Sequence, residues 1–227
     1  MHAPSDALTV RDRVLARADV EALPAGTALI GCDLEEADLS RLDLPGWRFE
    51  RCNLRRATLG GAKLEGTRWQ SCRGAFADFA GSDLNDAVFA ASDFNNASFR
   101  RCEAEGARYT DCKLTGADLT HLQAVEVLFE ESLLVGARLR RHDFRKAALK
   151  RIDLSQADLR ECDFRFATFE ESSLREAILD DARFEGADLR GADLGGLRLA
   201  DAGRFRGAVI SRDQAALLLD QLGLRVL

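Results

Sequence analysis

Large apolar residues recur at every fifth position along most of the chain. Counted in steps of five from Leu29 to Leu199, 32 of 35 positions are Leu, Phe, Trp or Tyr, without insertion or deletion. The exceptions are Gly74, Ala104 and Ala124. We call these 35 positions the centres. The period of five excludes an amphipathic helix, because residues five apart advance by about 500° around a helix of 3.6 residues per turn.

Small residues occupy the position two before each centre. Sixteen of these 35 positions are Ala and six are Cys, which accounts for every Cys in the protein. Residues two apart point to the same side of an extended segment. We therefore expect the centre and its small partner to face inward. The other three residues face solvent and form a turn, where a Gly two after the centre suits a positive φ.

A second period of twenty groups the pentads in fours. The small positions 37, 57, 77, 97, 117, 137, 157 and 177 are all Ala, and the centres 49, 69, 89, 109, 129 and 169 are all aromatic. Four pentads therefore make one coil, and like residues stack on like between coils. The sequence predicts a solenoid with four sides.

This pattern resembles the pentapeptide repeat family, whose motif is A(D/N)LXX. The motif occurs as ADL at 37–39, 117–119, 157–159, 187–189 and 192–194, and as CDF, SDF or CNL elsewhere. The resemblance covers roughly residues 27 to 201 and implies an all-β fold, a right-handed quadrilateral β-helix with short terminal α-helices. We expect an N-terminal helical cap at 1–26, the β-helix at 27–208, and a C-terminal helix and tail at 209–227.

Each end of a solenoid exposes the core and needs a cap. At the N-terminal end, residues 5–23 predict a helix that ends before Pro24. At the C-terminal end, Ser211 and Gln214 have the spacing of a capping box, and Gly223 is a natural stop.

The C-terminal segment is more apolar than a simple cap requires. Similar segments close the quinolone-resistance members of the family, the Qnr and MfpA types, by building a two-fold dimer. The resemblance therefore implies a homodimer, and a cap within a monomer is the alternative. The expected interface residues are Leu217, Leu218, Leu219, Leu222, Leu224 and Val226.

Charge and hydropathy narrow the class of protein. The net charge is −6, which argues against direct nucleic-acid binding, because such proteins carry a basic footprint. The chain has no apolar run of about 18 residues and no apolar segment of the kind found in secretory signals. We expect a cytoplasmic protein without a membrane span.

The residues that look chemical fit the core better than a catalytic site. Cys32, Cys52, Cys72 and Cys112 recur at multiples of 20, whereas zinc sites use Cys pairs two to four residues apart. His142 falls at an inward position, where we expect a buried, hydrogen-bonded imidazole. No phosphate-binding loop or catalytic triad is visible, so we expect no enzyme, no metal and no cofactor.

One side of the predicted coil, which we call the acidic face, concentrates carboxylates in the middle of the chain. It has its centres at 44, 64, 84, 104, 124, 144, 164 and 184, and no basic residue falls on it between Asp83 and Glu126. The candidate partner-binding residues are Asp83, Asp86, Glu103, Glu105 and Glu126. A solvated surface without function is the alternative.

Two irregular stretches leave alternatives open. Val125, Leu128, Leu133 and Val135 fall at outward positions, and they form either a contact patch or a locally repacked core. Phe76 is also nominally outward, and either stays there or folds inward to fill the space left by Gly74.

The resemblance also implies a function. It predicts a non-enzymatic protein that imitates DNA, binds DNA gyrase or topoisomerase IV, and protects the enzyme from fluoroquinolones or a toxin. Qnr-type members interrupt their repeats with loops, and this chain resembles the MfpA type in having no interruption. The rival hypothesis is an interaction scaffold with no topoisomerase role, since a fold does not determine a function.

Overall fold

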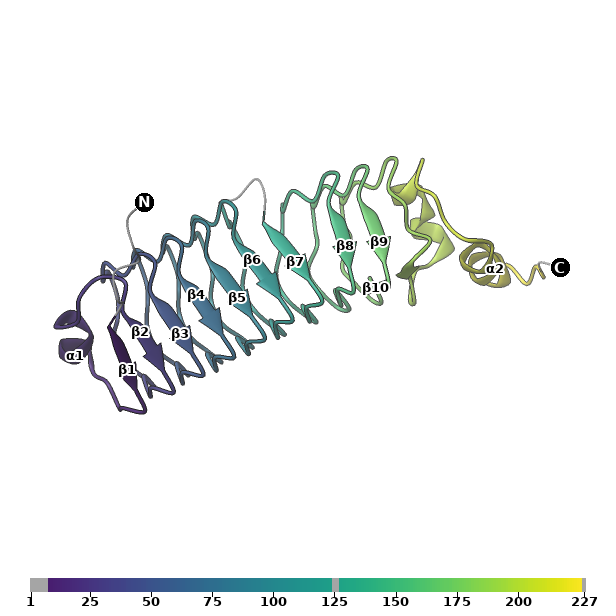
Figure 1. Cartoon of the computed structure of the whole chain (residues 1–227). Helices are drawn as coiled ribbons and strands as arrows, with labels where there is room; N and C mark the ends of the chain where they lie inside the picture. The colour runs from purple at the N-terminus through teal and green to yellow at the C-terminus, as the bar shows by residue number, and fades with distance from the viewer. Residues whose placement is uncertain (1–7, 124–126, 226–227) are drawn as a thin grey trace, which may run out of the picture.

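The protein is a rod of stacked coils with a short helix at each end (Figure 1). The computed structural model describes residues 8–123 and 127–225. The five-residue period is confirmed as a right-handed quadrilateral β-helix in which each coil takes twenty residues.

Short strands and helices make up the regular structure. The strands are β1 (Thr9–Arg11), β2 (Ala28–Ile30), β3 (Arg48–Glu50), β4 (Arg68–Gln70), β5 (Val88–Ala90), β6 (Arg108–Thr110), β7 (Leu128–Glu130), β8 (Ala148–Lys150), β9 (Thr168–Glu170), β10 (Ser172–Ser173) and β11 (Ala192–Asp193). The helices are α1 (Arg17–Glu21), the 3₁₀ helix η1 (Leu199–Phe205) and α2 (Arg212–Asp220). Within the described ranges, every helix is too short and too polar to cross a bilayer.

All four sides of the rod are held by parallel pairing between successive coils. Strands β1 to β9 form one nine-stranded parallel sheet in sequence order. The other three sides carry single bridges in the same register of twenty, of which Asp33 with Asn53, Asp38 with Thr58, and Asp43 with Lys63 are the N-terminal examples. Each coil therefore pairs only with its two neighbours.

The centres form the core, as the pattern predicts. From Leu29 to Leu189, every centre in the described residues is buried. Aromatic centres stack face to face along one side, with ring centroids 4.7 Å apart for Phe89 and Tyr109 and 5.1 Å apart for Tyr109 and Phe129. This stacking reflects the 20-residue period, because it places equivalent side chains one coil spacing apart.

From Gly31 to Gly186, each described residue two after a centre turns the corner with a positive φ, whether or not it is Gly. Asp86 has φ 56° and Phe166 has φ 60°. This left-handed backbone points the corner side chain away from the core, so Phe166 is 62% exposed. Corner positions therefore supply much of the surface chemistry of the rod.

The N-terminal helix predicted over 5–23 is wrong in its extent. Thr9–Arg11 forms strand β1, which pairs in parallel with β2, and Val14 bridges to Asp33. Helix α1 is confined to Arg17–Glu21. The strand prevails because an open β edge at the first coil offers hydrogen bonds that a short, marginal helix cannot match.

Phe76 does not fold inward to fill the space beside Gly74. Its side chain is 56% exposed. The Phe94 ring from the next coil occupies that space instead, and a Cβ at position 74 would collide with it. Gly74 is therefore required by the packing of Phe94.

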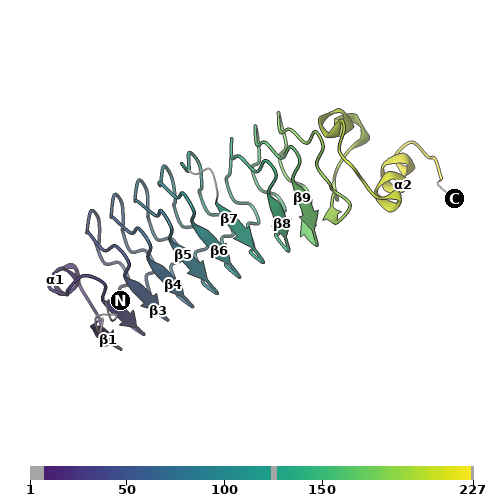
Figure 2. The ribbon, with the colours of Figure 1, turned by 45° about the horizontal axis from the view of Figure 1, so that its top comes forward.

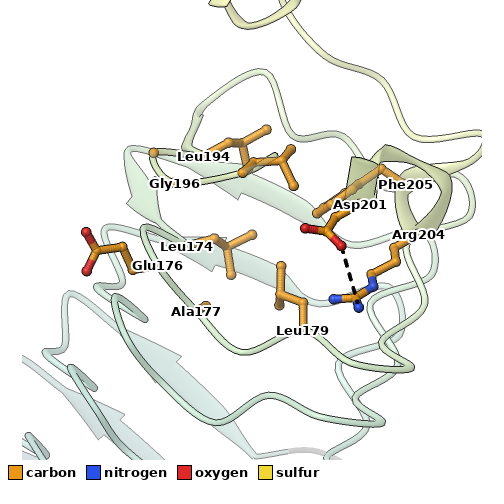
Figure 3. Close-up of a pocket in the computed structure, with 11 residues that line it drawn as sticks. Leu174, Glu176, Ala177, Leu179, Leu194, Gly196, Asp201, Arg204 and Phe205 are labelled. Carbon is orange, nitrogen blue, oxygen red and sulfur yellow. Dashed lines mark ion pairs between the residues drawn. The ribbon is translucent and has the colours of Figure 1, made fainter. Parts of the chain in front are cut away.

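Helix η1 closes the C-terminal end of the core, so α2 is not needed as a plug. The Phe205 ring extends a second aromatic column, that of Phe144, Phe164 and Phe184, with its centroid 4.6 Å from that of Phe184. Figure 3 shows Asp201 and Arg204 of η1 over the last coil, where a cavity of about 60 Å³ remains beside Leu174 and Phe205. The core ends here, with α2 beyond it.

Replacing Tyr109 with Phe is expected to stabilise the protein. The Tyr109 hydroxyl is fully buried in the aromatic column and has no hydrogen-bond partner within the described part of the chain. An unsatisfied buried polar group costs about 1–3 kcal/mol. The midpoint temperature of thermal unfolding should therefore rise by a few degrees in Tyr109→Phe. The reciprocal change, Phe89→Tyr, should lower it, and the opposite order would contradict this account.

Candidate functional site

The acidic face is one continuous ladder of bridges along the N-terminal half of the rod. Asp43, Lys63, Asp83, Glu103 and Gln123 pair in this order, each one coil beyond the last. The repeat thus places the carboxylates of Asp83 and Glu103 in adjacent coils, about 4.8 Å apart along the rod axis at the backbone. The structure confirms that these two predicted residues share a side.

Four acidic residues gather on this ladder, and we call them the acidic quartet: Asp83, Asp86, Glu103 and Glu105. Their backbone is held by Asn85, whose Oδ1 accepts the Glu105 N–H at 2.8 Å, while the Asn85 N–H donates to Asp83 Oδ1 at 3.0 Å. Asp86, Glu103 and Glu105 are exposed, and Asp83 is half-buried. The quartet is therefore fixed at its base and open to solvent at its carboxylates.

A glycine in the next coil makes room for Asp86. Gly106 has φ 69°, and a Cβ there would lie 2.6 Å from Asp86 Oδ1. The Asp86 carboxylate therefore lies against the bare backbone of the Gly106 corner. Any larger residue at position 106 would have to displace it.

Several acids outside the quartet pair with basic residues on the same face. Lys63 Nζ lies 3.1 Å from Asp43 Oδ2. Hydrogen bonds from Arg145 hold the pKa of Asp143 below its usual value. Asp83, Asp86 and Glu103 make no such ion pair within the described ranges, so the negative potential concentrates in the middle of the rod. The fifth predicted acid, Glu126, lies outside the described residues.

Helix α2 presents the second candidate surface. Ser211 and Gln214 form the predicted capping box, with Gln214 N–H donating to Ser211 Oγ at 3.1 Å. The Gln214 side chain then donates to the backbone oxygens of Leu189 and Ala192, both at 2.7 Å, which attaches α2 to the last coils. The helix is thereby fixed with one side turned away from the rod.

The six predicted interface residues are not equally available. Leu217, Leu222 and Leu224 are exposed, by 71%, 60% and 52%. Leu218 and Leu219 are half-buried. Val226 lies outside the described residues. The exposed leucines form an unpartnered apolar surface at the C-terminal end of the rod.

A model of pentapeptide repeats matches overlapping segments that together run from residue 25 to residue 196. The chain belongs to the pentapeptide repeat family. No curated protein sequence matches it.

The solved structure of one pentapeptide repeat protein, QnrB1, shares the fold. A trypsin-treated form of QnrB1, a plasmid-mediated fluoroquinolone resistance protein, is 20% identical, with a TM-score of 0.61, over 97% of this chain and 98% of that one. HetL, a protein involved in heterocyst differentiation regulation in the cyanobacterium Nostoc sp. strain PCC 7120, is 22% identical, with a TM-score of 0.44, over 82% of this chain and 88% of that one. At these identities the likeness concerns the fold.

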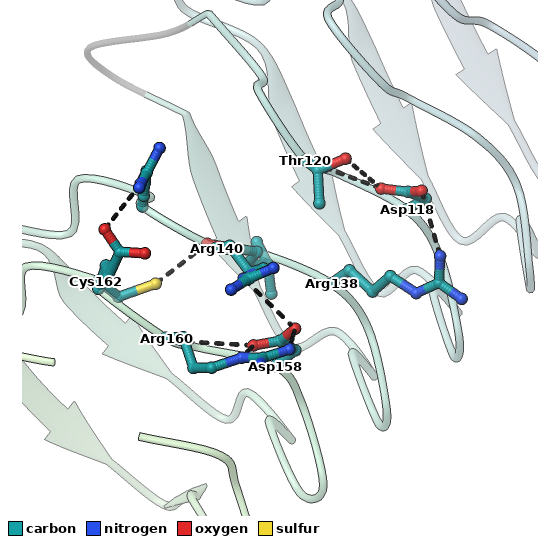
Figure 4. Close-up of polar contacts among 10 residues, drawn as sticks. Asp118, Thr120, Arg138, Arg140, Asp158, Arg160 and Cys162 are labelled. Atoms are coloured by element: carbon teal, nitrogen blue, oxygen red, sulfur yellow. Dashed lines mark hydrogen bonds and ion pairs between the residues drawn. The ribbon is translucent and has the colours of Figure 1, made fainter. Parts of the chain in front are cut away.

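The cysteines of this pentapeptide repeat protein belong to its core. All six are buried free thiols. Burial raises the pKa of Cys102 to about 11 and that of Cys162 to about 12, so neither is a thiolate at neutral pH. The Cys162 thiol donates to the Leu139 carbonyl oxygen at 3.0 Å (Figure 4). In the described ranges no three His, Cys, Asp or Glu side chains are grouped as metal ligands.

Arginines gather on a different side of the rod, where acids hold them. Asp158 accepts hydrogen bonds from Arg160 at 2.6 and 2.7 Å and lies 3.7 Å from Arg140, while Arg138 lies 3.5 Å from Asp118 (Figure 4). This basic cluster is thus largely paired with acids, unlike Asp83, Asp86 and Glu103.

The irregular stretch around residue 125 marks a feature that the repeat pattern did not resolve. Leu133 is 41% exposed, and Leu128 and Val135 are half-buried. Val125 and Ala124 lie outside the described residues. The available signal was the large residue at a small position, Leu122, which is only half-buried.

Proposed function

We propose that this pentapeptide repeat protein is a non-enzymatic DNA mimic. It binds DNA gyrase or topoisomerase IV in the cytoplasm through the acidic quartet, and it protects the enzyme from a fluoroquinolone or a toxin. The observation that carries this proposal is the concentration of carboxylates at the middle of one face, where Asp83, Asp86 and Glu103 form no ion pair with any described residue. Elsewhere on that face, basic side chains pair with Asp43, Asp143 and Asp163.

Charge density supports the comparison with DNA. The quartet places four carboxylates on two adjacent coils, which occupy about 10 Å of rod at the β spacing. Duplex DNA carries about six charges over that length. A protein surface that binds DNA phosphates with Lys and Arg would meet a similar linear density on this face.

A supercoiling assay with purified DNA gyrase tests the proposal. The protein should inhibit supercoiling or protect it from a fluoroquinolone, and added salt should weaken the effect steeply because charge drives the contact. Topoisomerase IV is assayed in the same way through decatenation. If neither enzyme is inhibited or protected at micromolar protein, the proposal is wrong and the interaction scaffold becomes the better hypothesis.

We further propose that α2 joins two rods into a homodimer. A double change of Leu217 and Leu222 to Asp should halve the mass measured by light scattering, because it places charges in an apolar contact. The matched control is Leu133→Asp, which changes an exposed leucine on the side of the rod. A monomeric wild-type protein, or a double variant of unchanged mass, would rule out this interface.

A further inference from the structure

The hydrogen-bond ladder of the rod is broken at one junction. At neighbouring junctions, Leu128 N–H donates to the Ala107 oxygen at 3.0 Å, and Thr168 N–H donates to the Ala147 oxygen at 2.9 Å. The equivalent bond from Ala148 N–H to the Val127 oxygen is not made, although both residues are described. Of the strand pairing between β7 and β8, only Glu130 with Lys150 remains.

The break extends to the neighbouring acidic face. Gln123 N–H donates to the Cys102 oxygen at 2.8 Å, and Asp163 N–H donates to the His142 oxygen at 3.0 Å. The intervening bond, from Asp143 N–H to the Leu122 oxygen, is missing between these two described residues. Two sides of the junction are therefore open.

The other two sides of the same junction stay closed. Leu133 pairs with Asp153, and Arg138 pairs with Asp158. Figure 2 shows the coils of β7 and β8 set farther apart than the coils on either side of them. The rod is thus opened as a wedge along one edge.

Packing inside the wedge is loosened. Leu122, Val127 and Ala147 are half-buried, whereas every other described small inward position between Leu42 and Ser172 is buried. A groove of about 730 Å³ lies over this edge. Its lining includes the apolar side chains of Val127, Leu128 and Phe166 and the cations Arg108, Arg145, Lys146 and Arg165.

Two of these cations have no ion pair among the described residues. Arg145 is paired with Asp143 and Arg165 with Asp163, with Nη2 to Oδ2 distances of 2.5 and 2.6 Å. Arg108 and Lys146 form no ion pair with any described residue, and both are exposed. The groove therefore combines apolar surface with excess positive charge, in a protein of net charge −6.

We propose that this groove binds an extended peptide segment of a partner protein that carries acidic side chains. One parted edge offers the Ala148 N–H as a donor, and the other offers the Val127 carbonyl as an acceptor. A peptide backbone satisfies both, as in β-strand addition. Alternate side chains then pack on Leu128 and Phe166 or pair with Arg108 and Lys146. An ionised phosphate has no donor for the Val127 carbonyl, and a peptide backbone carries donors and acceptors in alternation, so a peptide fits better.

Binding of a defined probe to the full chain tests this proposal. The probe is a six-residue capped peptide that alternates valine and glutamate, labelled for fluorescence polarisation. We expect it to bind at least about tenfold more tightly than the valine–lysine peptide or a version N-methylated at alternate amides. Equal affinity for the three peptides, or no binding of the glutamate peptide up to millimolar concentration, would overturn the proposal.

Variants and hydrogen exchange locate the contact. Reversing Arg108 and Lys146 to Glu should weaken binding about a hundredfold. Reversing Arg48 and Arg68, which share the strand position of Arg108 in earlier coils, should leave binding unchanged. The Ala148 amide should exchange faster than that of Thr168 and become protected when peptide is added. The site is contradicted if the charge reversal leaves peptide binding unchanged, or if the peptide does not protect the Ala148 amide. If protection of this amide rises with protein concentration in the absence of peptide, the groove binds a second copy of the chain instead.

Discussion

Reversing Asp83, Asp86, Glu103 and Glu105 together to Lys is expected to abolish inhibition or protection of gyrase. The four changes replace a negative surface by a positive one, which a DNA-binding channel repels. We expect the affinity for gyrase to fall at least about a hundredfold, which is equivalent to about 3 kcal/mol of binding free energy. The supercoiling assay measures the loss directly, and titration of binding at several salt concentrations should show that the salt dependence disappears with it.

The control keeps the same change in net charge but moves it to other sides of the rod. Asp111, Glu170, Glu171 and Asp181 are exposed acids away from the acidic face. Their joint reversal to Lys should retain most of the activity. Circular dichroism and thermal unfolding should show both quadruple variants folded, since all eight side chains lie outside the core. If the two variants lose activity equally, net charge and not the acidic quartet is responsible.

Acidification from pH 6.5 to pH 4 is expected to remove about 3 kcal/mol of stability through His142 alone. The imidazole is buried between Phe129 and Phe144, with ring centroids 6.2 and 4.4 Å away. Burial lowers its pKa to about 4, from an ordinary value of about 6.5. The unfolded chain then binds a proton that the folded protein does not. Stability is therefore full above pH 6.5 and is lost as the pH falls toward 4.

The variant His142→Leu isolates this contribution. Leu occupies the equivalent inward position at residue 42, where it is buried, so that position of the coil accepts a Leu side chain. Urea unfolding at several pH values between 7 and 4.5 should show a clear decline for the wild type and a much flatter profile for the variant. Parallel profiles would mean that another group accounts for the acid sensitivity. Arg-paired carboxylates such as Asp143 lose their contribution only at lower pH, because their pKa values are depressed.

The family resemblance and the periodicity predicted the rod and its acidic face. A period of five leaves one solution in which both inward positions stay buried, so the register of Asp83 over Glu103 followed directly from counting twenty residues. The same counting placed His142 inward, and that position is confirmed. Local spacing also predicted the capping box of Ser211 and Gln214, because that motif involves only residues three apart.

The ends and the irregular positions required the tertiary structure. The segment 8–16 has an amphipathic pattern that suits a helix. Within it, Thr9–Arg11 forms strand β1 instead, because it pairs with the open edge of β2. The sequence left open whether Phe76 fills the space beside Gly74. The ring that fills this space is that of Phe94, twenty residues after Gly74. Such outcomes depend on competition between partners far apart in the chain.

The sequence by itself determined where each repeated side chain points, since the inward and outward positions follow from a strict local period. Tertiary structure alone decided which charges stay uncompensated and where the ladder opens. Lys63 neutralises Asp43 because adjacent coils bring the two side chains together. No local sequence pattern predicts whether these side chains extend far enough to pair. The wedge between Val127 and Ala148 likewise depends on how two whole coils fit. A single oversized residue such as Leu122 indicates strain at the junction, but the balance of packing against hydrogen bonds decides which edge opens.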